Sequence, residues 1–187
     1  MRVIAGDAKG VRLGSVPPGT RPVSDMAREG LFASLGPDVA GARVLDLYAG
    51  TGALGIEALS RGAASATFVE RAAKAVGAIR ANLVRTKLAD RAEVVRADVG
   101  RWLTGSLATQ TEFDLVTLDP PYDVSGSPLE DALTALDRGW LAGQGWTVVL
   151  TRGHKSSRPV VPVHWAVRWQ LRYGDSLLTL YREERWA

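Results

Sequence analysis

The sequence predicts an α/β fold: a mostly parallel seven-stranded sheet with helices on both faces, a C-terminal antiparallel hairpin and a small N-terminal extension. From residue 43 onward, short apolar runs alternate with segments of helical spacing, the order typical of a parallel sheet crossed by helices. The first apolar run ends in three closely spaced glycines, at which a helix begins. The last two apolar runs are extended and joined by a short turn, which favours a hairpin.

The extension, residues 1–36, is expected to hold a hairpin and a helix. Two short apolar runs, 3–5 and 11–13, flank a glycine-containing turn and have the composition of strands. Ser24 suits the N-cap of a helix that runs to Leu35, because a Gly-Pro pair follows that leucine and stops the helix.

The remainder, residues 37–187, is expected to form one domain around the sheet. The apolar runs predict strands at 43–48, 66–70, 92–97, 113–119 and 145–151, and the hairpin strands at 160–171 and 175–182. Helical spacing predicts helices at 53–61, 72–86, 98–104 and 128–139.

Composition excludes several classes of protein. The 187 residues are 46% hydrophobic and 23% charged, which is typical of a globular chain. The chain has no cysteine, which excludes disulfides, thiolate metal sites and a cysteine nucleophile, and only two histidines, so we expect no metal. No apolar run reaches the roughly 18 residues of a membrane helix, and the first residues lack the apolar core of a signal peptide. We therefore expect a cytoplasmic protein without membrane partners.

Positive charge is concentrated at the two ends of the chain. Residues 1–36 hold five basic and three acidic side chains, and residues 151–187 hold seven basic and three acidic ones. The segment between them holds 11 basic and 14 acidic side chains. An acidic centre with basic flanks suits a cationic cofactor and a polyanionic substrate, although a solvated surface would have the same composition.

A glycine motif follows the first strand of the domain. Ligands of such sheets bind beyond the carboxyl ends of the strands. Gly50-x-Gly52-x-x-Gly55, with Glu70 at the end of the next strand, matches the dinucleotide-binding fingerprint. This motif alone would favour an NAD-dependent oxidoreductase.

Three further strand ends favour another ligand. Asp46 lies where its carboxylate would approach an ammonium or sulfonium group, and Asp98 could accept from an adenine amine. Asp119-Pro-Pro-Tyr122 ends the fourth strand, and its prolines have no N–H, so the Asp119 carboxylate and the Pro120 carbonyl can accept both hydrogens of an exocyclic amine. Tyr122 offers a flat face to a base, which would be flipped out of a duplex to reach it.

These motifs resemble those of class I S-adenosylmethionine-dependent methyltransferases that modify amino groups, which have a Rossmann-like fold. Four stretches narrow the resemblance to the RsmD family of bacterial small-subunit ribosomal RNA guanine-N2 methyltransferases: Arg2-Val-Ile-Ala-Gly, Arg21-Pro-x-Ser-Asp-x-x-Arg28-Glu-x-Leu-Phe32, Asp46-Leu-Tyr-Ala-Gly-Thr-Gly-Ala-Leu-Gly-Ile-Glu-Ala-Leu-Ser-Arg-Gly-Ala63 and Tyr-Gly-Asp-x-x-Leu-Thr-Leu-Tyr181. The resemblance implies methylation of the guanine at position 966 of 16S ribosomal RNA, in an assembling small subunit, by a monomer.

The resemblance also implies roles for individual residues. The S-adenosylmethionine site would be formed by Asp46, Tyr48, Gly50, Gly52, Glu70, Arg71, Asp98 and Val99. Asp119 and the Pro120 carbonyl would orient the guanine amine, and Tyr122 would stack on the base. RNA phosphates would be contacted by Arg12, Arg21 and Arg28. The alternative for Arg21 and Arg28 is a surface position, paired with a neighbouring acid such as Asp25 or Glu29.

Three other functions stay open from the residues themselves. An adenine-N6 methyltransferase would use the same Asp-Pro-Pro-Tyr motif, because that amine has the same two hydrogens. The glycine motif leaves an NAD-dependent oxidoreductase possible. A non-catalytic RNA-binding module would retain the fold without needing Asp119 or Tyr122.

Overall fold

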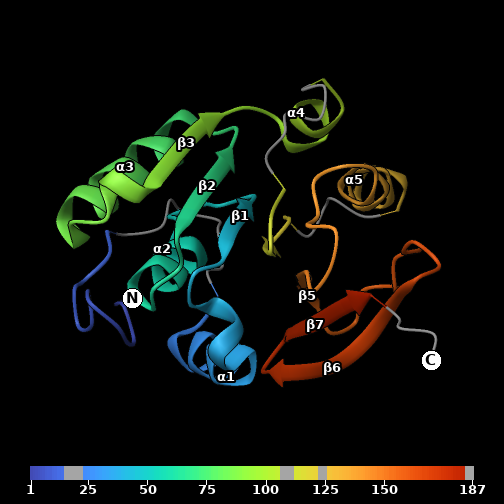
Figure 1. Cartoon of the computed structure of the whole chain (residues 1–187), viewed down its shortest axis with the longest axis horizontal. Coiled ribbons are helices and arrows are strands. Elements are labelled where there is room, and N and C mark those ends of the chain that lie inside the picture. Colours follow the sequence, from blue (N-terminus) through green and yellow to red (C-terminus); the bar gives the residue numbers. More distant parts are fainter. Residues whose placement is uncertain (15–22, 106–111, 122–125, 184–187) are drawn as a thin grey trace.

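A computed structural model of the chain describes residues 1–14, 23–105, 112–121 and 126–183 (Figure 1). The helices are α1 (Asp25–Leu35), α2 (Ala53–Ser60), α3 (Ala73–Thr86), α4 (Val99–Gly105) and α5 (Ser127–Asp137), with short 3-10 helices η1 (Gly36–Val39) and η2 (Ala89–Arg91). The strands are β1 (Arg43–Leu47), β2 (Ser65–Glu70), β3 (Ala92–Arg96), β4 (Leu115–Leu118), β5 (Thr147–Gly153), β6 (Trp165–Tyr173) and β7 (Ser176–Glu183).

The seven strands form one sheet in the order β3-β2-β1-β4-β5-β7-β6. Strands β1 to β5 are parallel, and β7 lies antiparallel between β5 and β6. The strand order reverses between β1 and β4, so a binding crevice is expected outside the carboxyl ends of these two strands. The predicted fold class, including the C-terminal hairpin, is confirmed.

Helices cover both faces of the sheet. Apolar side chains of α1, α2 and α3, such as Phe32, Ile56 and Ile79, belong to the core on one face. Those of α4 and α5, such as Leu103 and Leu133, belong to the core on the other face. This arrangement leaves the carboxyl ends of β1 and β4 between the two helical layers.

The N-terminal segment differs from the predicted pair of strands. Its strand-type pairing in the described part of the chain is limited to one antiparallel bridge, Arg2 with Arg12, beside which the Val3 N–H donates to the Val11 carbonyl at 3.0 Å and the Leu13 N–H to the Met1 carbonyl at 3.2 Å. The reason is that the N–H groups of Ile4 and Ala5 donate to the Glu57 carboxylate of α2, at 2.8 and 3.1 Å, instead of to a ladder partner. The segment runs beside α2 and α3 (Figure 1) and is attached to α2 by these bonds.

The hairpin begins later than predicted. Strand β6 starts at Trp165 instead of residue 160. Pro162 has no N–H to give to a ladder, and its carbonyl accepts from the Trp165 backbone N–H at 2.9 Å, which forms a turn before the strand.

The helix predicted in the extension forms α1, and the Ser24 hydroxyl accepts from the Ala27 N–H at 3.1 Å as its N-cap. Buried residues of the extension, including Val3 and Leu13, share one core with those of the sheet. The division at residues 36 and 37 stays a prediction. Within the described ranges, no helix combines the length and apolar character required to cross a bilayer.

Candidate active site

The glycine turn lies between β1 and α2 and leaves space above its backbone. Gly50 and Gly52 have φ values of +58° and +76°, and the Gly52 N–H donates to the Ala49 carbonyl at 2.7 Å. A Cβ at Gly50 would meet nothing closer than the Tyr48 carbonyl at 4.0 Å, so the space belongs to solvent or a ligand. Gly55 is different, because a Cβ there would clash with the Phe68 ring. The first two glycines therefore shape the turn, and the third allows α2 to pack on β2.

Asp46 is buried at the end of β1 and joins three elements. Its carboxylate accepts from the Gly55 N–H at 3.0 Å and from the Thr117 hydroxyl at 2.8 Å. Burial raises the pKa of Asp46 to about 7; the two hydrogen bonds oppose this shift, and the charge of Glu70 adds to it. A cation bound nearby would favour the ionised form of this carboxyl group.

Glu70 connects the end of β2 to the glycine turn. One carboxylate oxygen accepts from the Gly50 N–H at 3.0 Å, and the other accepts from the Ala72 N–H at 2.8 Å. Each oxygen keeps a second lone pair, which ribose hydroxyls could use. Glu70 can therefore hold both the turn and a sugar beside it.

The adenine side of the predicted cofactor site lies at the end of β3. Asp98 accepts from the Arg101 N–H at 3.1 Å, and Val99 is buried at the start of α4. Tyr48 is near this carboxylate, since burial and the charge of Asp98 raise the pKa of the Tyr48 phenol while Arg71 lowers it. The structure thus brings the predicted cofactor residues to one edge of the sheet.

Asp119 follows β4, directly beside the glycine turn. Its N–H donates to the Leu47 carbonyl at 3.4 Å, and its half-buried side chain is close enough to feel the charge of Asp46. Burial first, and then the negative charge of Asp46, raise the pKa of Asp119 to about 7. No hydrogen bond reaches this carboxylate from the described residues, so it can accept one from a ligand. Pro120 is buried, and Tyr122 lies outside the described residues.

The acidic character of this edge fits a cationic cofactor. Four carboxylates lie at the carboxyl ends of β1 to β4, and those of Asp46 and Glu70 accept hydrogen bonds from Gly55 and Gly50; the other two belong to Asp98 and Asp119. They would attract an ammonium or sulfonium group and repel the pyrophosphate of a dinucleotide. The open space above Gly50 and the free lone pairs of Glu70 give such a cofactor both room and partners.

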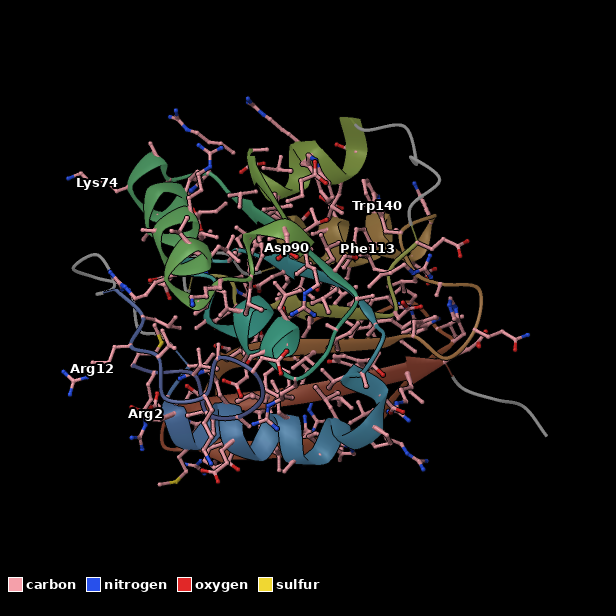
Figure 2. All side chains as sticks on the ribbon, turned by 60° about the vertical axis from the view of Figure 1, so that its left-hand side comes forward. Arg2, Arg12, Lys74, Asp90, Phe113 and Trp140 are labelled. Carbon is pink, nitrogen blue, oxygen red and sulfur yellow. The ribbon has the colours of Figure 1, made fainter. Side chains whose placement is uncertain are left out.

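The predicted RNA-contacting arginines have different surroundings. Arg12 is exposed and points away from the body of the protein (Figure 2). Arg21 lies outside the described residues. Arg28 is fully buried, so the prediction that it contacts RNA at the surface is wrong.

Arg28 is buried because it is part of a charged cluster between α1 and α2. Its guanidinium donates to the Asp25 carboxylate and to the Arg2 carbonyl, both at 2.6 Å, and to the buried Glu57 at 3.5 Å. The suggested pairing with Asp25 is thus present, but in the interior. Glu57 also accepts from Arg61 at 2.7 Å, so this cluster attaches the N-terminal segment to α2.

Two buried polar side chains near the site were not predicted. The strand register pairs Leu118 with Leu150, which places Thr151 beside Asp119 on the neighbouring strand. Thr151 is only 4% exposed, and its hydroxyl has no hydrogen-bond partner in the described part of the chain. Asn82 of α3 donates to the Thr51 carbonyl of the glycine turn at 3.0 Å and accepts from the Gly14 N–H at 2.7 Å. In the sequence, each of these two residues is marked only by being a polar side chain on an otherwise apolar face of a strand or helix.

Comparison with known proteins gives one family. The family model described as "Conserved hypothetical protein 95" matches residues 1–182. The chain is 36% identical to the Ribosomal RNA small subunit methyltransferase D of Escherichia coli K12 over 187 residues, which covers 98% of this chain and 90% of that protein. It is 32% identical to the protein of the same name from Haemophilus influenzae, covering 97% and 93%.

Solved structures agree with this family. The structure of the Escherichia coli protein yhhF is 35% identical, with a TM-score of 0.84 and 98% of each chain covered. A hypothetical protein from Thermus thermophilus is 31% identical, with a TM-score of 0.82 and coverage of 97% and 99%. The family match, the acidic edge around the glycine turn and the sheet order agree, and the chain therefore belongs to the RsmD family of class I S-adenosylmethionine-dependent methyltransferases.

Proposed function

We propose that this chain methylates the exocyclic N2 of a guanine in 16S ribosomal RNA during small-subunit assembly, at the site equivalent to position 966. The observation that carries the proposal is the Asp119 carboxylate, which is half-buried beside the cofactor turn and accepts no hydrogen bond from the described residues. The relatives named as ribosomal RNA small subunit methyltransferases support this substrate. Under this proposal the protein acts as a monomer in the cytoplasm.

The proposed mechanism is positioning of an amine for in-line attack. The Asp119 carboxylate and the Pro120 carbonyl accept the two amine hydrogens, which favours a pyramidal nitrogen with an available lone pair. Tyr122 is proposed to stack on the guanine. S-adenosylmethionine, when bound, supplies a methyl group on a positively charged sulfur. Transfer of that methyl group from sulfur to the amine nitrogen would leave the amine with one extra proton, which Asp119 or water would accept.

The chain's other site residues hold this geometry. Glu70 fixes the Gly50 backbone and is proposed to hold the ribose, and Asp98 with Val99 is proposed to hold the adenine. Asp46 supports the turn through Gly55 and adds negative charge to the sulfonium side. Such positioning removes much of the entropic barrier to a two-substrate reaction.

Transfer of labelled methyl groups tests the proposal. The protein is incubated with labelled S-adenosylmethionine and small subunits that lack the modification, and the RNA is digested to nucleosides. We expect label in N2-methylguanosine. Label in N6-methyladenosine would favour the adenine alternative, and absence of label from guanine would refute the proposal. A parallel series with bare RNA, partly assembled subunits and finished subunits shows at which stage of assembly the enzyme acts.

A further inference from the structure

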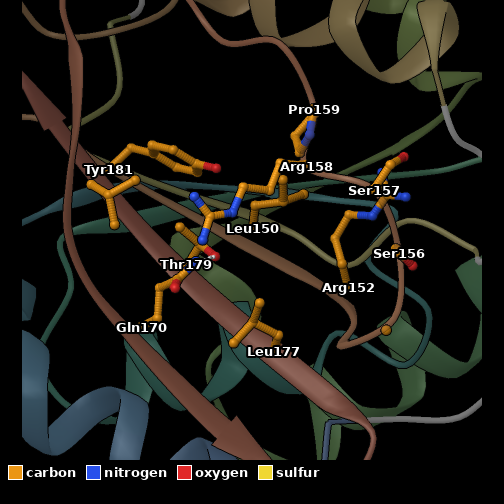
Figure 3. A pocket seen from close by; sticks show the side chains of 12 residues that line it. Leu150, Arg152, Ser156, Ser157, Arg158, Pro159, Gln170, Leu177, Thr179 and Tyr181 are labelled. Carbon is orange, nitrogen blue, oxygen red and sulfur yellow. Dashed lines mark hydrogen bonds between the residues drawn. The ribbon is translucent and has the colours of Figure 1, made fainter.

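A cavity of about 270 Å³ lies at the C-terminal hairpin, on the face of the sheet that α4 and α5 cover (Figure 3). Its apolar lining comes from Leu150 of β5, Leu177 of β7 and the ring of Tyr181. Arg152 and Arg158 contribute the cationic part, from the end of β5 and from the loop that follows it. The volume is close to the lower end of the range of about 300–1,000 Å³ usual for ligand pockets, which suits a single nucleotide.

The two arginines are directed at this cavity. Figure 3 shows the Arg158 side chain reaching across it toward Tyr181 and Thr179, while Arg152 lies beside Ser157. Burial raises the pKa of the Tyr181 phenol, and the positive charges of Arg158 and Arg152 act against that shift. Both charges therefore reach the interior of the cavity.

The acids in the described part of the chain do not pair with these two arginines. In the described ranges, neither Arg152 nor Arg158 forms an ion pair. Glu130 of α5 instead accepts from the Val160 N–H at 3.0 Å, and so anchors the loop. Asp137 is occupied by the Trp165 indole N–H at 2.8 Å and by His164 at 2.9 Å. The cavity consequently has an apolar floor and two guanidinium groups without an acidic partner among the described residues, which suits a phosphate-bearing ring system.

The cavity is close to the proposed base site. The register of β4 and β5 places Thr151 beside Asp119, at the usual strand spacing of about 4.8 Å. Arg152 is the next residue, with its Cα about 3.8 Å further along, and its side chain points to the opposite face of the sheet. A strand of RNA that places one base at Asp119 could therefore put its neighbouring nucleotide over the sheet edge at Arg152.

We infer that this cavity binds the nucleotide next to the methylated guanine, with its phosphate between Arg152 and Arg158 and its ring on the apolar floor. The inference rests on the proposed function, because RNA is the substrate assumed. It assigns these arginines to substrate positioning, and the methyl transfer itself stays at Asp119.

Steady-state kinetics with three arginine variants tests this inference. Arg152→Ala and Arg158→Ala each remove a proposed phosphate contact, whereas Arg168→Ala removes the same charge from an exposed position of β6 outside the cavity lining. For the first two we expect the KM for RNA to rise about 10- to 100-fold, the range for loss of a charged hydrogen bond. The kcat and the affinity for S-adenosylmethionine should not change. Arg168→Ala should change KM less than about twofold, the usual limit for an exposed substitution.

The salt dependence of RNA binding gives a second measure. Removal of Arg158 should reduce the slope of log affinity against log salt by about 0.7, the value for one phosphate of a single strand. If all three variants have the same KM and slope, the cavity is only part of a general positive surface and the inference is wrong. Arg158→Gln repeats the measurement with a polar side chain in case the alanine variant does not fold.

Photo-crosslinking separates this inference from the proposed function. RNA with 4-thiouridine beside the target guanine is irradiated with the wild-type protein, and the linked peptide is identified. A link to residues 150–158 or to Tyr181 is expected, and its absence would overturn the inference. If wild-type protein crosslinks there but transfers no methyl group to guanine, the proposed reaction fails while the binding site stands.

Discussion

Asp119 and Asp46 lie at the ends of neighbouring strands, and burial raises the pKa of each carboxyl group to about 7, with a further contribution from the charge of Glu70 at Asp46 and from the charge of Asp46 at Asp119. Their hydrogen-bonding differs, because Asp46 is held by Thr117 and Gly55, whereas Asp119 has no donor among the described residues. Asp46 is therefore a structural anchor as well as a charge, and Asp119 is the carboxylate available to a substrate.

Replacement of Asp119 by asparagine should reduce methyl transfer without removing the cofactor. Asparagine keeps the size of the side chain but offers one acceptor oxygen and no charge. We expect kcat/KM to fall by about 10²–10³-fold, as for other preorganised polar groups at reacting centres. Single-turnover transfer and calorimetric binding of S-adenosylmethionine measure the two effects. Asp114→Asn is the matched control, since Asp114 pairs with Arg43 at the other end of β4 and should affect stability alone.

Cofactor binding should release protons. Near neutral pH, Asp46 and Asp119 are partly protonated in the free protein, and a cation beside them lowers their pKa values. Affinity for S-adenosylmethionine should therefore increase as the pH rises from about 6 to 7.5. Calorimetry at pH 6.5 in buffers of different ionisation heat counts the protons released. Asp119→Asn should reduce that number, whereas Asp114→Asn should leave it unchanged, because Arg43 lowers the pKa of Asp114.

The raised pKa values of Asp46 and Asp119 also make the folding stability depend on pH. Because the folded-state pKa values of Asp46 and Asp119 lie above the usual value of 3.8, these groups stabilise the free protein at low pH, and this contribution is lost as the pH rises through about 7. The cofactor should consequently increase the melting temperature more at pH 7.5 than at pH 6.

In the turn between β1 and α2, Gly50 faces open space whereas Gly55 packs against Phe68. A matched pair of alanine variants distinguishes these two roles. Gly50→Ala places a methyl group in the open space above the turn. Because φ is positive at this position, the alanine should destabilise the protein by about 1 kcal/mol. It should stay folded and lose cofactor affinity. Gly55→Ala drives a methyl group into Phe68 and should lower the free energy of unfolding by about 1–3 kcal/mol or more.

Denaturant unfolding and cofactor calorimetry measure this pair. The assignment of Gly50 to the cofactor would be refuted if Gly50→Ala bound S-adenosylmethionine as tightly as the wild type while remaining folded.

Arg12 and Arg28 are both predicted from the sequence to contact RNA, but Arg28 lies buried at the contact between α1 and α2. Arg28→Ala leaves Glu57 buried without its full set of donors, so the free energy of unfolding should fall by about 3–5 kcal/mol. Arg12→Ala removes an exposed charge and should weaken RNA binding with almost no change in stability. Chemical denaturation and RNA titration of both variants check this. Weaker RNA binding by a fully stable Arg28→Ala protein would contradict the structural role.

The sequence predicts helices and strands correctly where the hydrophobic periodicity agrees with the residues that start and stop these elements. The glycine turn, the cap at Ser24 and the alternation after residue 43 were all predicted, because each depends on local chemistry. The two predicted N-terminal strands are reduced to one bridge, because the N–H groups of Ile4 and Ala5 donate to Glu57, more than 50 residues away in the chain. The burial of Arg28 depends on how α1 packs on α2, and the position of Thr151 beside Asp119 depends on the register of β4 and β5. Neither packing nor register is specified by the local sequence.

Across the whole molecule, charge is divided between an acidic site and basic surroundings. The cofactor edge carries four carboxylates, whereas the C-terminal region carries arginines such as Arg152 and Arg158. We expect RNA affinity of the wild type to fall steeply between 50 and 200 mM salt, since release of counterions dominates such binding, and S-adenosylmethionine affinity to change little. Filter binding of RNA and calorimetry with S-adenosylmethionine over this salt range measure the two affinities. Equal salt sensitivity of both ligands would contradict this division of charge.

The attachment of the first residues to α2, and the position of β7 inside the sheet, have a consequence for synthesis of the chain. The acceptor of Ile4 and Ala5, Glu57, is made more than 50 residues after them. Strand β7 follows β6 in the chain, yet it lies between β5 and β6. The N-terminal segment and β5 must therefore wait for partners that are made later. A nascent chain that stalls before residue 176 would expose the edge of β5, which makes synthesis of β7 the step that protects this edge from aggregation.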